Sequence, residues 1–119
     1  MKKVLVVEDQ VSIRQLMRFT LQTRYTVVEA ADAAEAYGII SAELPDAVIM
    51  DVMMPGMNGF QLCEKLRHED GLWSLPIIIL TACAQTKDRL MGTKAGADIY
   101  MIKPFSPTEL LTAVDSLLD

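Results

Sequence analysis

The stretch Ala47-Val48-Ile49-Met50, followed at once by Asp51, decides how this sequence is expected to fold. Four apolar residues in succession do not alternate between core and solvent, so they predict a strand that is buried on both faces. Such strands lie inside parallel sheets whose two faces are covered by helices. A carboxylate directly after such a strand stands at the carboxyl edge of the sheet, where ligands bind in open parallel sheets. One short segment therefore indicates both a fold class and a candidate site.

Four further apolar runs extend this pattern along the whole chain. They are Val4-Leu5-Val6-Val7, Thr26-Val27-Val28, Ile77-Ile78-Ile79-Leu80 and Ile99-Tyr100-Met101-Ile102. Spacings of three and four residues predict helices between them, as in the sets Ile13, Leu16, Met17, Leu21 and Leu110, Leu111, Val114, Leu117, Leu118. Strands that alternate with helices predict an α/β fold with a parallel sheet and right-handed crossovers. Five such units in 119 residues predict a flavodoxin-like (βα)5 three-layer sandwich.

Helix start signals support this division of the chain. Ser106 precedes Pro107 and stands three residues before Glu109, the pattern of a capping box with proline at the first helical position. Asp32 is predicted to cap a second helix, and Asn58 and Thr86 are predicted to cap two more. The helices are thus expected to begin shortly after the strand ends.

Composition limits the function classes. The length of 119 residues predicts one domain, residues 1–119, and the 51% of hydrophobic residues is enough to bury a core. The net charge of −5, with no run of Lys or Arg, argues against direct binding to nucleic acid. No apolar stretch could span a membrane and the N-terminus does not form a signal peptide, so a cytoplasmic location is expected. Cys63 and Cys83 lack metal-ligand spacing and are expected to be reduced thiols.

Polar side chains follow four of the five apolar runs. Glu8 and Asp9 follow the first, Asp51 the third, Thr81 the fourth and Lys103 the fifth. Because the carboxyl ends of parallel strands share one edge, these side chains are expected to lie close together.

The charges of this set indicate its chemistry. Three carboxylates and one ammonium leave two negative charges, which match one divalent cation, and an all-oxygen site suits Mg²⁺. A carboxylate beside Mg²⁺ and a lysine can act as a nucleophile towards phosphorus, with the two cations neutralising the transferring group. Taken singly, each residue has a simpler explanation, since Asp often caps turns and Glu8-Asp9 suits a helix N-terminus. The coincidence of all five favours the functional interpretation.

Five motifs connect this set with a known family. They are Val7-Glu8-Asp9, the segment from Val48 to Gly59, Leu80-Thr81-Ala82, Gly96-Ala97-Asp98 and Lys103-Pro104-Phe105. In these motifs and their order, the chain resembles the receiver domain of bacterial two-component response regulators over its whole length. The resemblance implies the strand order 2-1-3-4-5. It also implies transfer of a phosphoryl group from a histidine kinase, a phosphotransfer protein or a small phosphodonor.

The resemblance assigns a role to each acidic residue. Asp51 matches the phosphoacceptor, and Asp9 matches a direct ligand of Mg²⁺, for which Mn²⁺ can substitute. Glu8 matches a partner that acts on the metal largely through water. Met53 matches the position that supplies a backbone carbonyl to the metal.

The same resemblance implies a switch. Thr81 matches the hydroxyl that moves towards the phosphoryl group, and Tyr100 matches the aromatic residue that turns inward when it does. Lys103 matches the family's conserved lysine, whose peptide bond to Pro104 is usually cis. The output face implied is that of the fourth helix, fifth strand and fifth helix, which we expect around Thr86–Met91, Tyr100 and Leu110–Asp115.

Three competing functions are less well supported. A hydrolase of the haloacid-dehalogenase type needs a second Asp two residues after the nucleophile, and Met53 stands there. A flavin or nucleotide binder needs a phosphate loop after the first strand, and Glu8-Asp9-Gln10 has the wrong charge. A degenerate receiver used only for contacts would have lost acidic or lysine positions. The chain is therefore expected to catalyse only its own phosphorylation and dephosphorylation, not to be an enzyme with a separate substrate.

Departures from relatives with DNA-binding output domains narrow the downstream role. Ile99 replaces the second Asp of their Ala-Asp-Asp-Tyr, and the last helix, at Thr112-Ala113-Val114-Asp115, lacks their dimer-forming Arg residues. We therefore expect a monomer or a weak phosphorylation-dependent dimer that acts on an output domain or protein target. The resemblance implies that the side chains of Met53 and Cys83 flank the path of hydrolytic water, and a thioether and a thiol are expected to orient that water poorly. This predicts a long-lived phosphorylated state, suited to transcription or phosphorelay.

Overall fold

The computed structural model describes residues 1–69, 71–82 and 95–119. Its five strands form one parallel sheet in the order β2-β1-β3-β4-β5, which confirms the predicted order. The strands are β1 (Lys3–Val7), β2 (Thr26–Ala30), β3 (Ala47–Asp51), β4 (Ile77–Thr81) and β5 (Ile99–Ile102). Each predicted apolar run lies within one of them.

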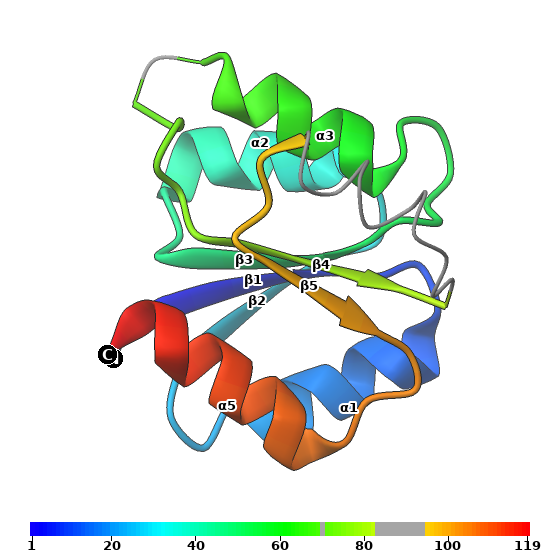
Figure 1. Ribbon diagram of the computed structural model, residues 1–119, viewed down its shortest axis with the longest axis vertical. Helices are drawn as coiled ribbons and strands as arrows, with labels where there is room; N and C mark the ends of the chain where they lie inside the picture. Colours follow the sequence, from blue (N-terminus) through cyan, green and yellow to red (C-terminus); the bar gives the residue numbers. More distant parts are fainter. Residues whose placement is uncertain (70, 83–94) are drawn as a thin grey trace.

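Four helices cover the sheet in the described part of the chain. They are α1 (Val11–Leu21), α2 (Ala33–Glu43), α3 (Gly59–Arg67) and α5 (Pro107–Leu118). Figure 1 shows α2 and α3 on one face of the sheet and α1 and α5 on the other. The predicted three-layer sandwich is thus confirmed, while Thr86, predicted to cap a further helix, lies outside the described residues. None of the described helices is both long enough and apolar enough to cross a bilayer.

Strand burial follows the position of each strand in the sheet. All residues of β3 and β4 are buried, as consecutive apolar side chains require, because neighbouring strands and both helix layers surround them. The edge strands β2 and β5 are only partly buried. Alternate residues of the strands point to opposite faces of the sheet and form two core clusters. Leu5, Val48 and Ile79 pack towards α2 and α3. Val6, Ile49 and Ile78 pack towards α1 and α5.

Three predicted caps are present. The Asp32 carboxylate accepts a hydrogen bond from Glu35 N at 2.8 Å, and Ser106 Oγ accepts one from Glu109 N at 3.0 Å. Asn58 forms a complete capping box with Gln61, with both hydrogen bonds at 2.9 Å. Helix α3 therefore begins at a defined residue beside the end of β3.

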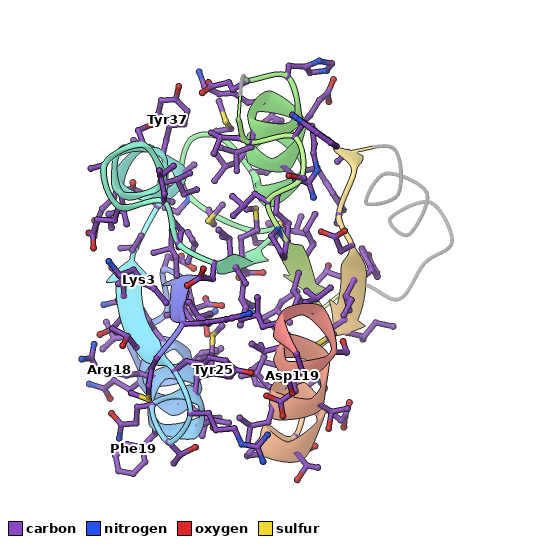
Figure 2. The ribbon with its side chains drawn as sticks, turned by 90° about the vertical axis from the view of Figure 1, so that its left-hand side faces the viewer. Lys3, Arg18, Phe19, Tyr25, Tyr37 and Asp119 are labelled. Carbon is purple, nitrogen blue, oxygen red and sulfur yellow. The ribbon has the colours of Figure 1, made fainter. Side chains whose placement is uncertain are left out.

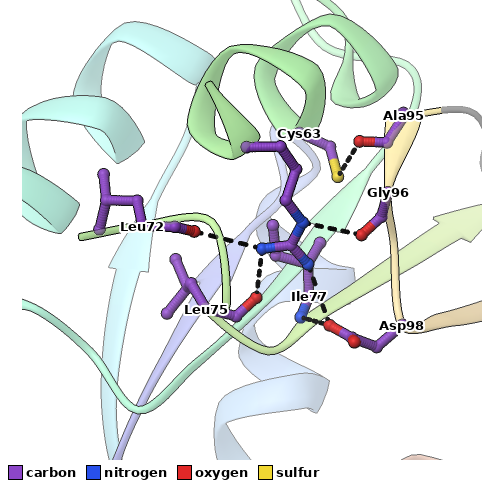
Figure 3. Close-up of polar contacts among 8 residues, drawn as sticks. Cys63, Leu72, Leu75, Ile77, Ala95, Gly96 and Asp98 are labelled. Atoms are coloured by element: carbon purple, nitrogen blue, oxygen red, sulfur yellow. Dashed lines mark hydrogen bonds and ion pairs between the residues drawn. The ribbon is translucent and has the colours of Figure 1, made fainter. Parts of the chain in front are cut away.

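A single arginine on α3 anchors the chain where it re-enters the sheet (Figure 3). The Arg67 guanidinium donates to the carbonyl oxygens of Gly96, Leu72 and Leu75 and to the Asp98 carboxylate. Gly96 has a φ of 93°, and a Cβ there would lie 2.9 Å from Arg67 Cγ, so both backbone and space favour glycine. Arg67 thus ties α3 to the start of β5 and explains the Gly96-Ala97-Asp98 motif structurally.

The cysteine that the structure describes is inert. Cys63 is buried and free, and its thiol donates to the Ala95 carbonyl at 3.3 Å. Burial raises the pKa of the Cys63 thiol to about 11, so it stays protonated. The expectation of a reduced core cysteine is confirmed for Cys63, while Cys83 lies outside the described residues.

The expected output surface on the last helix needs correction. Leu110 and Val114 lie in the core, and the Asp115 carboxylate binds Arg24 and Tyr25 at the turn between α1 and β2. Helical periodicity turns these residues away from the surface that the continuous range Leu110–Asp115 implied. Only part of this segment can therefore belong to an exposed face.

Gly59 provides a test of how the fold positions the site. A Cβ at Gly59 would lie 2.5 Å from the Asp51 carbonyl oxygen, so α3 can begin here only with glycine. We expect Gly59→Ala to lower the free energy of unfolding by about 1–3 kcal/mol, the usual cost of overpacking. Urea unfolding would measure it.

Gly38→Ala is the matched control. Gly38 lies inside α2 and is exposed, and a Cβ there would meet nothing within 4 Å. The free energy of unfolding of this variant should be higher than that of the wild type by roughly 0.5–1 kcal/mol, because glycine destabilises the interior of a helix relative to alanine. Equal stability of Gly59→Ala and the wild type would mean that α3 can move away from β3 at no cost.

Candidate functional site

The carboxyl edge of the sheet gathers the side chains predicted from the strand ends. Glu8 follows β1, Asp51 ends β3, Thr81 ends β4 and Lys103 follows β5. Glu8, Asp51 and Thr81 are the buried polar or charged residues of the described chain. Lys103 N donates to the Thr81 carbonyl at 2.7 Å, so the backbone brings the ends of β4 and β5 together.

Lys103 is shared between two buried carboxylates. Its Nζ lies 2.9 Å from Glu8 Oε2 and 2.9 Å from Asp51 Oδ2, and its side chain is only 15% exposed. Burial alone would lower the pKa of Lys103, but its hydrogen bonds to Glu8 and Asp51 outweigh burial and raise it. The lysine therefore stays protonated and supplies a fixed positive charge to the site.

The Glu8 carboxylate is the most deeply placed of the acidic groups. It is fully buried, and burial raises its pKa; the hydrogen bond from Lys103 opposes this rise, and the charge of Asp51 adds to it. Gln10 N also donates to Glu8 Oε1, at 3.2 Å. Two carboxylates so close together favour any further positive charge at this edge.

The donor set fits a divalent cation. Glu8, Asp9 and Asp51 each offer an oxygen, and these atoms all lie within 4.8 Å of one another. Glu8 and Asp51 are buried, whereas Asp9 is exposed and opens the cluster to solvent. With Lys103, the set carries two net negative charges, and an all-oxygen set of this kind suits Mg²⁺.

Met53 lies in the loop directly after β3. Its amide N is 3.4 Å from Asp51 Oδ1, and its side chain is 72% exposed. The side chain therefore does not pack over the carboxylate in this conformation, which favours a role for the backbone alone. The role of its carbonyl in metal binding and the lifetime hypothesis both stay predictions.

The position of Tyr100 connects the site's sheet to α3. Its ring stacks on Phe60 with centroids 6.4 Å apart and planes inclined by 4°, and Tyr100 is half-buried. In the sheet it pairs with Ile79, two residues before Thr81. Thr81 and Tyr100 thus lie on the adjacent strands β4 and β5. The switch that would couple them stays a prediction. The Lys103–Pro104 bond is cis, as expected.

Two residues that contribute to the site were not given a role from the sequence. Gly59 allows α3 to begin against the Asp51 carbonyl, and its place in the matching motif was the available signal. Arg14 donates from Nη1 to the Glu8 carbonyl at 2.8 Å. No local pattern marks Arg14, because its second partner, Glu29, comes from another strand.

Comparison with known proteins is consistent with this geometry. The family model for the response regulator receiver domain matches residues 4–115. The chain is 47% identical to the "Probable transcriptional regulator ycf27" of Cyanophora paradoxa, over 98% of this chain and 48% of that protein. It is 36% identical to the phosphate regulon transcriptional regulatory protein PhoB of Escherichia coli, over 98% of this chain and 52% of that protein. The chain thus spans about half the length of these relatives.

Solved structures show the same architecture. The chemotaxis response regulator CheY4 of Vibrio cholerae superposes with a TM-score of 0.93 at 36% identity, covering 98% of each chain. The resemblance predicted from the five motifs is confirmed by these matches.

The metal site can be tested through stability. Replacing the exposed carboxylate of Asp9 with a neutral amide removes like-charge repulsion from the cluster. Without metal, Asp9→Asn should therefore raise the melting temperature by roughly 2–4 °C, as expected for about half a kcal/mol. The stabilisation that Mg²⁺ gives the wild type should be lost, which thermal unfolding in EDTA and in Mg²⁺ would measure.

Glu64→Gln is the control for this measurement. Glu64 is exposed on α3, and the change also removes one negative charge while keeping the side-chain shape. Its response to Mg²⁺ should equal that of the wild type. A full Mg²⁺ response in Asp9→Asn would place the cation elsewhere.

Proposed function

Because the chain belongs to the response regulator receiver domain family, we propose that Asp51 accepts a phosphoryl group and that the surrounding side chains catalyse the transfer. The observation that carries this proposal is the pairing of Asp51 with Lys103 at 2.9 Å, inside a cluster of three carboxylates. A buried carboxylate with a fixed ammonium beside it, and with two further carboxylates that could hold a cation, is suited to attack on phosphorus.

The proposed step uses each of these groups. An oxygen of Asp51 forms a bond to phosphorus, while the bond from phosphorus to the donor's nitrogen or oxygen breaks and its electron pair leaves with the donor. The Lys103 ammonium neutralises charge on the phosphoryl oxygens. Glu8, Asp9 and Asp51 would hold Mg²⁺ or Mn²⁺, together with the Met53 carbonyl; the bound cation supplies further positive charge there. The buried Thr81 hydroxyl is proposed to approach the transferred group.

The partners follow from this chemistry and from the relatives. We propose a histidine kinase or phosphotransfer protein as the donor, with small phosphodonors as substitutes. Because the relatives' names denote transcriptional regulators about twice as long as this chain, we propose an output domain or protein target for the signal. The domain itself, with its net charge of −5, is not expected to bind nucleic acid.

A hydrolase of the haloacid-dehalogenase type is the alternative. That chemistry needs a proton-transferring carboxylate two residues after the nucleophile, where this chain has the exposed thioether of Met53. A thioether carries no exchangeable proton. We therefore propose phosphorylation and dephosphorylation of Asp51 alone, without turnover of a separate substrate.

The acceptor assignment has a direct test. Acetyl phosphate with Mg²⁺ should add one phosphoryl group to the wild type and none to Asp51→Asn, because an amide oxygen is a poor nucleophile. Intact-mass spectrometry would measure both.

Asp46→Asn is the matched control, since Asp46 lies next to β3 at the opposite end from Asp51 and is more exposed. That variant should be phosphorylated like the wild type. Labelling of Asp51→Asn at the wild-type rate would show that another residue is the acceptor.

A further inference from the structure

Arg14 lies in the first turns of α1 and reaches back to the end of β1. Its Nη1 donates to the Glu8 carbonyl at 2.8 Å, and its Nε donates to Glu29 Oε1 at 3.2 Å. The Arg14 side chain is only 19% exposed. The guanidinium thus connects the helix, strand β2 and the first residue of the acidic cluster.

The carbonyl that Arg14 binds has a particular position in the chain. It belongs to the peptide unit that joins Glu8 to Asp9, so its orientation sets the direction in which the Asp9 side chain leaves the backbone. The preceding peptide unit is held separately, by the hydrogen bond from Glu8 N to Ala30 O at 3.0 Å. Within residues 1–69, 71–82 and 95–119, no hydrogen bond or ion pair holds the Asp9 carboxylate itself. Among the contacts of the described residues, the hydrogen bond from Arg14 is therefore the one that holds the peptide unit between Glu8 and Asp9.

The charge of Arg14 is partly offset by Glu29, which also pairs with Arg18. Both oxygens of Glu29 are used, one by Arg14 and the other by Arg18. Arg18 lies at the surface, 48% exposed, one helical turn further along α1 (Figure 2). Arg18 thus shares the ion pair with Glu29 but makes no contact with Glu8. A comparison of variants at Arg14 and Arg18 therefore distinguishes the effect of the hydrogen bond to Glu8 from the effect of a positive charge beside Glu29.

We propose that Arg14 is a positioning residue that holds the Glu8–Asp9 peptide in the orientation needed to bind a divalent cation. This inference rests on the metal site proposed above. Partners that orient metal ligands without touching the metal typically change metal affinity by about 10–100-fold when removed. The charge of Arg14 would repel a cation, and Glu29, which Arg14 shares with Arg18, offsets only part of that charge. Arg18 has the same ion pair without the hydrogen bond to Glu8, so a change at Arg18 measures the charge effect alone.

The test is a Mg²⁺ titration followed by the melting temperature and by calorimetry, without any phosphodonor. Arg14→Gln should raise the dissociation constant for Mg²⁺ by about tenfold. Arg14→Lys should restore part of the affinity, because an ammonium can donate to the Glu8 carbonyl but cannot also bridge to Glu29 in the same fork geometry. Arg18→Gln removes the same charge from the same ion pair and should leave Mg²⁺ affinity unchanged.

Each other outcome overturns the inference. Tighter Mg²⁺ binding in both Gln variants would show that Arg14 acts only through its charge. A lower melting temperature in EDTA with unchanged Mg²⁺ affinity would give Arg14 a purely structural role. If Arg14→Gln fails to fold, Arg14→Lys decides, and wild-type affinity in that variant counts against positioning. No Mg²⁺ binding by the wild type would remove the proposed metal site itself, a result distinguishable from an effect confined to Arg14.

Discussion

The Lys103 ammonium, shared between the buried carboxylates of Glu8 and Asp51, is the contact on which the carboxyl edge of this sheet depends. Removing a carboxylate from water costs several kcal/mol, and two of them at short range repel each other as well. A protonated lysine that donates to both offsets these costs. The two carboxylates can therefore lie side by side at the carboxyl edge of the sheet, where we propose that they bind a cation and that Asp51 accepts a phosphoryl group.

That contact in turn requires the order of the strands. Glu8 follows β1 and Asp51 ends β3, so the two carboxylates lie side by side because these strands pair in the middle of the sheet. Lys103 reaches them from the edge strand β5, two strands away from β3. Strand β5 is held at both ends, by the hydrogen bond between Lys103 N and the Thr81 carbonyl and by the contacts of Arg67 with Gly96 and Asp98. The firmly held backbone of β5 thus positions the long, flexible side chain of Lys103.

The apolar runs and strand ends were sufficient to predict the strands, the sandwich and the clustering of acidic residues with Lys103. The strand order came only from the family resemblance, because hydrophobic patterns do not say which strands are neighbours. Arg14, Arg67 and Asp115 could not be assigned from the sequence, since each pairs with partners far along the chain. The contact of the half-buried Asp115 with the turn between α1 and β2 likewise depends on how α5 is rotated about its axis, which the helical periodicity did not fix to a single position.

The same lysine has a different task in each proposed state of the site. Before phosphorylation its positive charge is divided between Glu8 and Asp51. A phosphoryl group on Asp51 would place more negative charge within reach of Lys103 and would draw the ammonium away from Glu8. Because Lys103 shares a backbone hydrogen bond with Thr81, and Tyr100 lies on the same strand, such a shift would act on β4 and β5 together. We therefore propose charge redistribution at Lys103 as one route by which phosphorylation of Asp51 would act on β5.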